Sequence, residues 1–475
     1  PIMQFFRRVL LIAAMAVVPL VFALGTANAQ QVPASRADIA MSFSPVVKNT
    51  APSVVNVYAK RIVQSQGRRR PFGADPFFRR FFGDELFGGR PRRRAQNSLG
   101  SGVIVDETGI IITNNHVIKN GTEIRVVLSD KREFDAELVL TDERTDLAVL
   151  RIEPEGDPLV ALSLGDSDAL EVGDLVLAIG NPFGVGQTVT SGIVSALART
   201  RVGVSSYQFF IQTDAAINPG NSGGALVDMN GRLIGINTAI FSRSGGSNGI
   251  GFAIPVNMVR SVIEQTLSGA TKVVRPWVGA DLQNVTSDLA SALGLNRPRG
   301  ALVSKLHPSS PLKKAGIKRG DVLLRLAGKP IENAQEFSFR FATLPVGEES
   351  RVVFSRKSKR FKTDVALAAA PEDPPRNTTV IKGRSPFTGL EVVNVSPAVA
   401  EELGLPALVE GVAVSAVRRS LARRFGFKKG DVIVELNESK LASVSDLRRV
   451  LRRRDGYWDV AILRKGKLIR REFGG

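Results

Sequence analysis

The chain has 475 residues, no cysteine, two histidines and a formal net charge of +19. The absence of cysteine excludes a disulfide scaffold and a cysteine nucleophile, and the length is enough for about three domains. The positive charge is typical of proteins that contact nucleic acid, anionic membranes or acidic partners, but it does not exclude an enzyme.

The N-terminus has the pattern of a secretory signal. Arg7 and Arg8 precede the apolar stretch Val9–Leu24, and Ala27-Asn28-Ala29 provides small residues for cleavage before Gln30. We therefore predict that residues 1–29 are a signal peptide that is removed on export. If cleavage failed, the protein would instead remain tethered to the inner membrane.

After an N-terminal segment at 30–44, residues 45–268 form a succession of short apolar runs separated by Gly, Asn and Asp. This spacing predicts an all-β barrel or sandwich. The clearest runs are Gly102–Val105, Ile110–Thr113, Ile124–Leu128, Leu147–Ile152, Leu175–Ile179 and Leu233–Ile236.

Residues 66–97 interrupt this pattern with alternating Arg and Phe blocks, as in Phe77-Phe78-Arg79-Arg80-Phe81-Phe82. One interpretation is a solvated insertion, and another is a loop between subunits that packs Phe into a neighbouring active site. Basic and aromatic alternation also suits anionic membrane surfaces or single-stranded nucleic acid. Export argues against a nucleic-acid partner.

A glycine-flanked serine stands at Gly220-Asn221-Ser222-Gly223-Gly224. The glycines let the backbone turn sharply, so that the hydroxyl stands clear and neighbouring N–H groups converge. An exposed nucleophile beside such donors is what acyl transfer requires. We expect the N–H groups of Gly220 and Ser222 to form an oxyanion hole, with Asn221 shaping the loop.

A serine nucleophile needs a base, and only His116 and His307 are available. His116 ends the apolar run Ile110–Thr113, where a strand holds a side chain firmly. His307 precedes Pro308 in a turn-like stretch that we expect to face solvent. Asp146 leads into another apolar run and could orient the imidazole. The order His116, Asp146, Ser222 is that of chymotrypsin-type proteases.

The C-terminal half contains an internal repeat, because Gly316–Leu323 recurs as Gly426–Ile433. Each copy is followed by a helix-like stretch, which predicts two modules at 275–370 and 385–475. A Pro- and charge-rich linker at 371–384 separates them. The Gly-x-x-x-Gly-Asp pattern resembles PDZ domains.

Three motifs together resemble the HtrA/DegP family of periplasmic serine endoproteases: Thr113–Val117, Thr145–Leu150 and Asn218–Leu226. The similarity extends from about Pro45 to the C-terminus, and Gly249–Pro255 also matches. The resemblance implies an all-β trypsin-like double β-barrel protease domain followed by two small α+β PDZ domains. It also implies a periplasmic location, a homotrimer and higher homo-oligomers.

The resemblance places Ala216 at the base of the specificity pocket, with Ile236, Asn237 and Thr238 as its wall. An uncharged base favours small aliphatic residues before the cut, so unfolded or misfolded polypeptides would be the substrates. Asp214 could add charge to the pocket, although its place before Ala215-Ala216 favours a structural role.

PDZ grooves capture C-terminal carboxylates with backbone N–H groups. By resemblance, the capturing loop is Trp277-Val278-Gly279-Ala280 in the first copy and Thr388-Gly389-Leu390 in the second. The second copy is equally consistent with a role in assembly alone, since its 418–424 turn is basic.

We expect no metal and no cofactor, and the absence of a phosphate-binding loop predicts that the protein works without ATP. A chaperone activity accompanies proteolysis in this interpretation. The alternative is a PDZ-based chaperone or scaffold whose protease domain is mainly structural.

Overall fold

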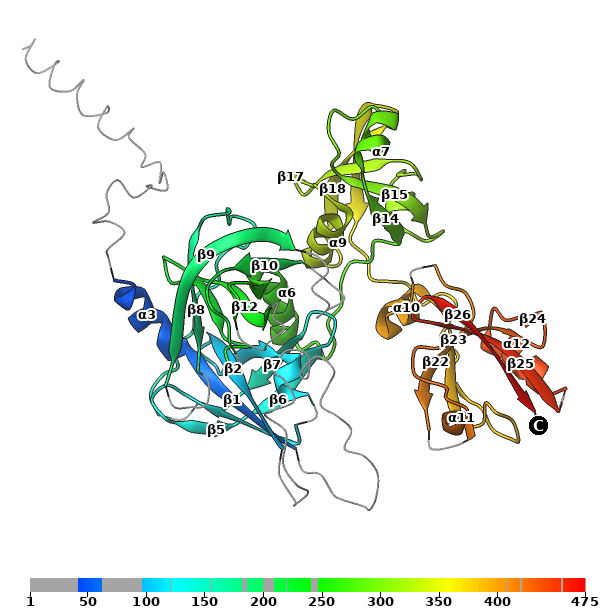
Figure 1. The fold of residues 1–475 in the computed structure, drawn as a ribbon, viewed down its shortest axis with the longest axis horizontal. Helices are drawn as coiled ribbons and strands as arrows, with labels where there is room; N and C mark the ends of the chain where they lie inside the picture. The colour runs from blue at the N-terminus through cyan, green and yellow to red at the C-terminus, as the bar shows by residue number, and fades with distance from the viewer. Residues whose placement is uncertain are drawn as a thin grey trace, which may run out of the picture. The chain divides into compact units, whose positions relative to one another are not determined.

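The computed structural model describes residues 42–61, 96–119, 121–154, 156–181, 186–199, 209–218, 220–240, 247–406, 408–418, 421–453 and 456–474. The predicted signal peptide and nearly all of the predicted insertion at 66–97 lie outside the described residues. Strands make up more of the described chain than helices do (Figure 1). A helix, α3 (Ser44–Thr50), and a 3₁₀ turn, η1 (Ala51–Ser53), come before the first strand.

The first sheet is antiparallel, with strand order β5-β4-β1-β2-β3-β7-β6. Alternate residues such as Val55, Val57 and Ile104 are buried in its core. Its strands are β1 (Val54–Arg61), β2 (Gln96–Asp106), β3 (Ile110–Asn114), β4 (Glu123–Val127), β5 (Glu133–Asp135), β6 (Glu137–Asp142) and β7 (Leu147–Arg151). A short helix, α5 (Asn115–Ile118), follows β3 directly.

The next six strands close into a barrel in the order β10-β13-β12-β11-β8-β9. They are β8 (Leu175–Gly180), β9 (Thr188–Arg199), β10 (Phe210–Thr213), β11 (Ala225–Asp228), β12 (Leu233–Ile240) and β13 (Gly251–Pro255). Helix α6 (Val256–Leu267) then contacts β12 and β13. Val259, Val262 and Ile263 are buried on the helix at the three- and four-residue spacing of an amphipathic helix.

A second antiparallel sheet follows, with order β14-β15-β16-β18-β19 and the short β17 paired to β16. Phe337 and Phe341 are buried in its core, one helical turn apart. The elements are β14 (Ala280–Asn284), α7 (Ser287–Ala292), β15 (Ala301–Leu306), α8 (Pro311–Lys314), β16 (Val322–Leu326), β17 (Lys329–Pro330), α9 (Ala334–Thr343), β18 (Glu349–Arg356) and β19 (Lys359–Ala366).

The last part of the chain repeats this topology, as β21-β22-β23-β25-β26 with β24 paired to β23, and adds β20 at the edge. Both copies are visible as small sheets with short helices in Figure 1. The elements are β20 (Thr379–Val380), β21 (Leu390–Asn394), α10 (Pro397–Leu403), β22 (Val412–Val417), α11 (Leu421–Arg424), β23 (Val432–Leu436), β24 (Ser439–Lys440), α12 (Val444–Leu451), β25 (Tyr457–Arg464) and β26 (Lys467–Gly474).

The repeated aspartate of the Gly-x-x-x-Gly-Asp pattern has the same structural role in both copies. Asp321 is buried, accepts the N–H of Lys318 at 2.7 Å and pairs with Arg356 through both of its oxygens. Asp431 accepts the N–H of Lys428 at 2.8 Å and pairs with Arg464 in the same way. A buried carboxylate needs such partners, which explains why the aspartate recurs with the turn.

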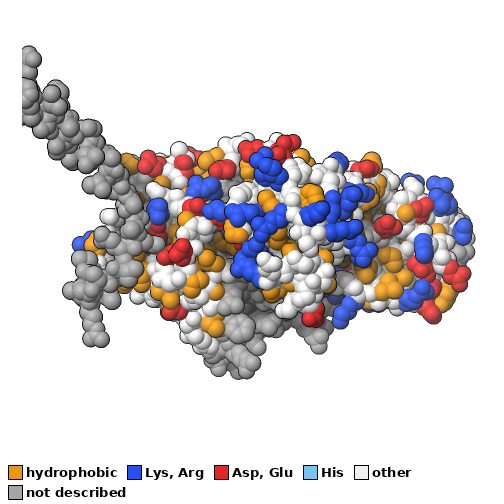
Figure 2. All heavy atoms as spheres, turned by 90° about the horizontal axis from the view of Figure 1, so that it is seen from above, with side chains coloured by type: hydrophobic (Ala, Val, Ile, Leu, Met, Phe, Trp, Pro, Cys, Tyr) orange, Lys and Arg blue, Asp and Glu red, His pale blue; other side chains and the backbone are white. Residues whose placement is uncertain are grey.

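Lys and Arg side chains are numerous on the face shown in Figure 2, in keeping with the net charge of +19. In the part of the chain that the structure describes, no helix is both long and apolar enough to cross a membrane.

Candidate active site

His116 lies in the first turn of α5, directly after β3. All five residues of β3 are buried, so the strand fixes the start of the helix, and His116 itself is only 8% exposed. Strand β3 pairs with β7 so that Asn114 lies opposite Leu147. This pairing brings Asp146, the residue before β7, next to His116.

Asp146 occupies the turn between β6 and β7 and has a positive φ of 63°. Its Oδ2 atom lies 2.6 Å from His116 Nδ1, and its Oδ1 atom accepts the backbone N–H of His116 at 3.0 Å. The hydroxyl of Thr238 donates to Oδ2 at 2.9 Å. The carboxylate is therefore held from two directions, and it fixes the orientation of the imidazole.

Ser222 stands in the turn before β11, and its neighbour Gly223 has a φ of 85°. A Cβ at Gly223 would lie 2.1 Å from the carbonyl oxygen of Ser101, so only glycine fits there. The hydroxyl of Ser222 donates to the carbonyl of Thr238 at 3.4 Å. Thr238 thus links Ser222, from the closed barrel, to Asp146, from the first sheet.

The loop before Ser222 is held by Ser101. The Ser101 hydroxyl donates to the carbonyl of Gly220 at 2.6 Å and accepts the N–H of Asn181 at 2.8 Å. The N–H of Asn221 donates to Asn218 at 3.0 Å, and its side chain is buried. Among the described residues, the N–H groups of Gly220 and Ser222 donate to no other group. These two N–H groups can bind an oxyanion, whereas that of Asn221 is already used.

The predicted pocket residues lie on both sides of this loop. Ala216 is partly buried, and its carbonyl accepts the hydroxyl of Thr190 at 2.8 Å. Ile236 and Asn237 are fully buried on β12, where Asn237 exchanges backbone hydrogen bonds with Gly223 and Gly224. In this arrangement Asn237 supports the serine turn.

Asp214 is exposed, and its carboxylate accepts the N–H of Ile193 at 2.7 Å. This hydrogen bond gives Asp214 a structural role at β9, which is the role that its sequence position favoured.

His307 differs from its sequence-based prediction. Its ring is partly buried and packs edge-on against Trp277, with ring centres 5.1 Å apart, and its Nδ1 accepts the N–H of Ser309. Burial and the nearby Lys313 lower the pKa of His307 below its usual 6.5, although Asp373 opposes this shift. His307 was expected to face solvent, but it packs against Trp277, while the next residue of the turn, Pro308, is exposed.

The predicted carboxylate loop of the first copy has unused donors. The N–H of Trp277 donates to Ala368, but those of Val278 and Gly279 donate to no group among the described residues. Gly279 has a φ of 63°, and a Cβ there would lie 2.9 Å from Ser310. The corresponding donors of the second copy are used: Thr388, Gly389 and Leu390 donate to Ser385, Ile381 and Phe387.

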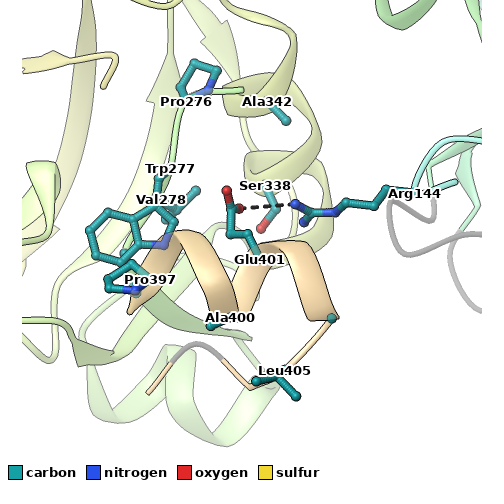
Figure 3. A pocket seen from close by; sticks show the side chains of 13 residues that line it. Arg144, Pro276, Trp277, Val278, Ser338, Ala342, Pro397, Ala400, Glu401 and Leu405 are labelled. Atoms are coloured by element: carbon teal, nitrogen blue, oxygen red, sulfur yellow. Dashed lines mark ion pairs between the residues drawn. The ribbon is translucent and has the colours of Figure 1, made fainter. Parts of the chain in front are cut away.

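A pocket of about 280 Å³ lies along this first loop (Figure 3). Trp277–Ala280 line one side together with Ser338 and Ala342 of α9. Pro397, Ala400, Glu401 and Leu405 also line it, and Glu401 pairs with Arg144 at 3.4 Å. The loop, α9 and α10 thus border an open, partly apolar hollow beside the N–H groups of Val278 and Gly279.

Two features of the site were missed in the sequence. Ser101 and Thr238 hold the serine loop and Asp146 through hydrogen bonds that span 119 and 92 residues. No sequence motif predicts this role for either residue, because their hydrogen bonds form only where the two sheets meet. Thr238 was expected only in the pocket wall.

Two parts of the chain match known protein families. Residues 100–236 match the family described as trypsin-like peptidase domain, and residues 276–367 match the PDZ domain family. The chain is 40% identical over 446 residues to the periplasmic serine endoprotease DegP of Salmonella typhimurium, covering 89% of this chain and 88% of that protein. It is 38% identical over 431 residues to the periplasmic pH-dependent serine endoprotease DegQ of Escherichia coli K12, covering 90% of each.

Among solved structures, the chain is similar to the HtrA-type protease AlgW with decapeptide, with a TM-score of 0.51 and 42% identity. That match covers 70% of this chain and 100% of the other. The predicted fold class, a trypsin-like β-barrel domain followed by PDZ domains, is confirmed. The chain belongs to the DegP/DegQ family of HtrA-type periplasmic serine endoproteases.

Proposed function

We propose that this protein cleaves unfolded or misfolded exported polypeptides, with Ser222 as the nucleophile, His116 as the base and Asp146 as the residue that orients His116. The observation that carries the proposal is the 2.6 Å contact between Asp146 Oδ2 and His116 Nδ1. The bridge from Asp146 through Thr238 to the Ser222 hydroxyl supports it.

In the proposed cycle, Ser222 Oγ attacks the scissile carbonyl carbon while His116 takes the hydroxyl proton. His116 then returns that proton to the leaving amine, and a water hydrolyses the acyl-enzyme by the same route. Asp146 stabilises the imidazolium in both halves. The N–H groups of Gly220 and Ser222 bind the oxyanion, since no other acceptor uses them among the described residues.

The proposed substrates follow from the pocket. Ala216 at its base offers no carboxylate to a Lys or Arg side chain, and Ile236 is apolar. Small aliphatic residues before the scissile bond suit such a pocket. Because these residues are usually buried in folded proteins, unfolded chains would present them most often.

We propose that the first PDZ copy captures peptide C-termini at Trp277–Ala280, which the unused N–H groups of Val278 and Gly279 support. The loop Thr388–Leu390 has its N–H groups committed, which favours a role in assembly for the second copy. The proposed assemblies are homotrimers and higher homo-oligomers. We also propose that the protein has a chaperone activity and that it contacts anionic membrane surfaces.

The proposed location is the periplasm, reached through cleavage of the signal peptide at 1–29, with a tethered form as the alternative. The proposed domain limits are 45–268 for the protease, 275–370 and 385–475 for the PDZ copies, and 371–384 for the linker. An insertion at 66–97 would belong to the protease domain.

The test compares hydrolysis of fluorescein-labelled casein by the wild type with that by Ser222→Ala, His116→Ala and His307→Asn. The first two variants should lose turnover by about a thousandfold or more, whereas His307→Asn should retain it. Circular dichroism would show that each variant is folded. Near-normal turnover in Ser222→Ala would refute the serine assignment and favour a PDZ scaffold with a structural protease domain.

A further inference from the structure

The turn that presents Asp146 needs support. Asp146 has a φ of 63°, a left-handed conformation that is unfavourable for a residue with a Cβ. Strand β6 ends at Asp142 and β7 begins at Leu147, so only three residues separate Asp142 from Asp146. Neighbouring residues must therefore hold this turn in place if the Asp146 carboxylate is to stay within hydrogen-bond distance of His116.

Asp142 holds the turn through hydrogen bonds to two of its residues. Its Oδ1 atom accepts the N–H of Arg144 at 3.2 Å, and its Oδ2 atom accepts the hydroxyl of Thr145. Asp142 and Thr145 are 7% and 2% exposed. The carboxylate of Asp142 therefore binds the residue directly before Asp146, inside the protein.

A buried carboxylate is stable as an anion only when it is paired. Arg275 Nη2 lies 2.5 Å from Asp142 Oδ2, and Arg275 is 5% exposed. Among the described residues, Arg275 is the cationic side chain that pairs with Asp142. Arg275 Nη2 also lies 3.6 Å from Met258 Sδ of α6, which limits its movement.

Arg275 comes from a different part of the chain. It follows α6 and stands two residues before Trp277, the first residue of the proposed carboxylate loop. The chain of contacts therefore runs from the start of the first PDZ copy, through Arg275, Asp142 and Thr145, to the turn that carries Asp146.

We infer that Arg275 is a positioning residue for the proteolytic reaction, acting through Asp142 and Thr145 to hold Asp146 against His116. The inference rests on the proposed role of Asp146. Loss of Arg275 leaves Asp142 buried without its cation, so the turn rearranges and the Asp146 carboxylate moves from Nδ1. The imidazolium that forms on His116 then lacks its stabilising carboxylate, so proton transfer from Ser222 is less favourable.

The test uses the full chain with casein as substrate and measures kcat, KM and the pH profile of kcat/KM for Arg275→Met, Arg275→Lys and Asp142→Asn. Arg275→Met should lower kcat by roughly tenfold or more while KM changes by less than about twofold. The acidic limb of its pH profile should shift to lower pH, because Asp146 no longer stabilises the charged imidazole. Arg275→Lys keeps the positive charge, so its kcat and its pH profile should be close to those of the wild type.

Arg260→Met is the matched control, since Arg260 lies on α6 and donates to the carbonyl of Gly165 rather than to the turn. It should leave kcat and the pH profile unchanged. The double variant Arg275→Met/Asp142→Asn should be no worse than Arg275→Met alone, because the two residues act as a unit.

Circular dichroism shows which variants fold. If Arg275→Met does not fold, Asp142→Asn is compared with Arg275→Lys instead. Folded Arg275→Met or Asp142→Asn with wild-type kcat and pH profile would overturn the inference. Hydrolysis by Ser222→Ala would instead overturn the proposed function, so the two failures are distinguishable.

Discussion

Thr238 is the residue that joins the two halves of the candidate site. Its hydroxyl donates to Asp146 at 2.9 Å, while its carbonyl accepts the hydroxyl of Ser222 at 3.4 Å. It is 1% exposed, so water does not replace these contacts. The orientation of the Asp146 carboxylate therefore depends on a residue from the opposite barrel.

Thr238→Val should lower kcat/KM by roughly ten- to hundredfold, because it removes a hydrogen bond to a charged group, worth about 1.5–3 kcal/mol. Val has nearly the same shape and leaves the backbone carbonyl in place. Thr266→Val is the control, because the Thr266 hydroxyl is also buried but donates within α6 to Val262. Equal kcat/KM in the wild type and Thr238→Val would contradict this role.

The candidate triad could be named from the sequence because each member stands in a local pattern. His116 follows an apolar run, Asp146 precedes another, and Ser222 stands in a glycine-rich turn. Thr238 and Ser101 could not be found in this way, since their contacts depend on how two separate sheets meet. His307 was expected in solvent because Pro308 follows it, but packing on Trp277 determines its place.

At the scale of the elements, the two C-terminal copies share a topology but differ at one loop. Both contain a buried aspartate paired with an arginine, and only the aspartate belonged to the repeat seen in the sequence. Their carboxylate loops differ in how the backbone donors are used. Within the described part of the chain, the N–H groups of Val278 and Gly279 have no acceptor, whereas those of Thr388–Leu390 bind within their own copy. The sequence left the function of the second copy open, because the use of backbone donors depends on the folded loop and not on residue type.

Gly279→Ala should weaken binding of a peptide with an apolar C-terminal residue and a free carboxylate by roughly tenfold or more. A Cβ at a φ of 63° is strained and would lie 2.9 Å from Ser310, so the loop must move. Calorimetry on full-length protein carrying Ser222→Ala would measure this without cleavage.

Gly389→Ala is the matched control, because Gly389 has a φ of 89° at the equivalent loop of the second copy. It should leave peptide affinity unchanged, and an amidated peptide should bind poorly to both the parent and Gly389→Ala. Equal weakening by the two glycine substitutions would contradict the assignment of peptide capture to the first copy.

At the scale of the whole molecule, the candidate site lies where the open sheet and the closed barrel meet. The open sheet supplies His116 and Asp146, and the closed barrel supplies Ser222 and Thr238. The repeated short apolar runs predicted these β-elements, and the repeated Gly–Asp pattern predicted the two C-terminal copies. The junction at Arg275 was not predicted, because nothing in the local sequence pairs it with Asp142.

The central claim is that Ser222 is the nucleophile activated by His116. The most direct measurement is covalent labelling of the full chain with a fluorophosphonate, followed by mass spectrometry of the modified peptide. One residue, Ser222, should be phosphonylated, and labelling should be lost in Ser222→Ala and strongly slowed in His116→Ala. Labelling at another serine, or undiminished casein hydrolysis after complete labelling of Ser222, would contradict it.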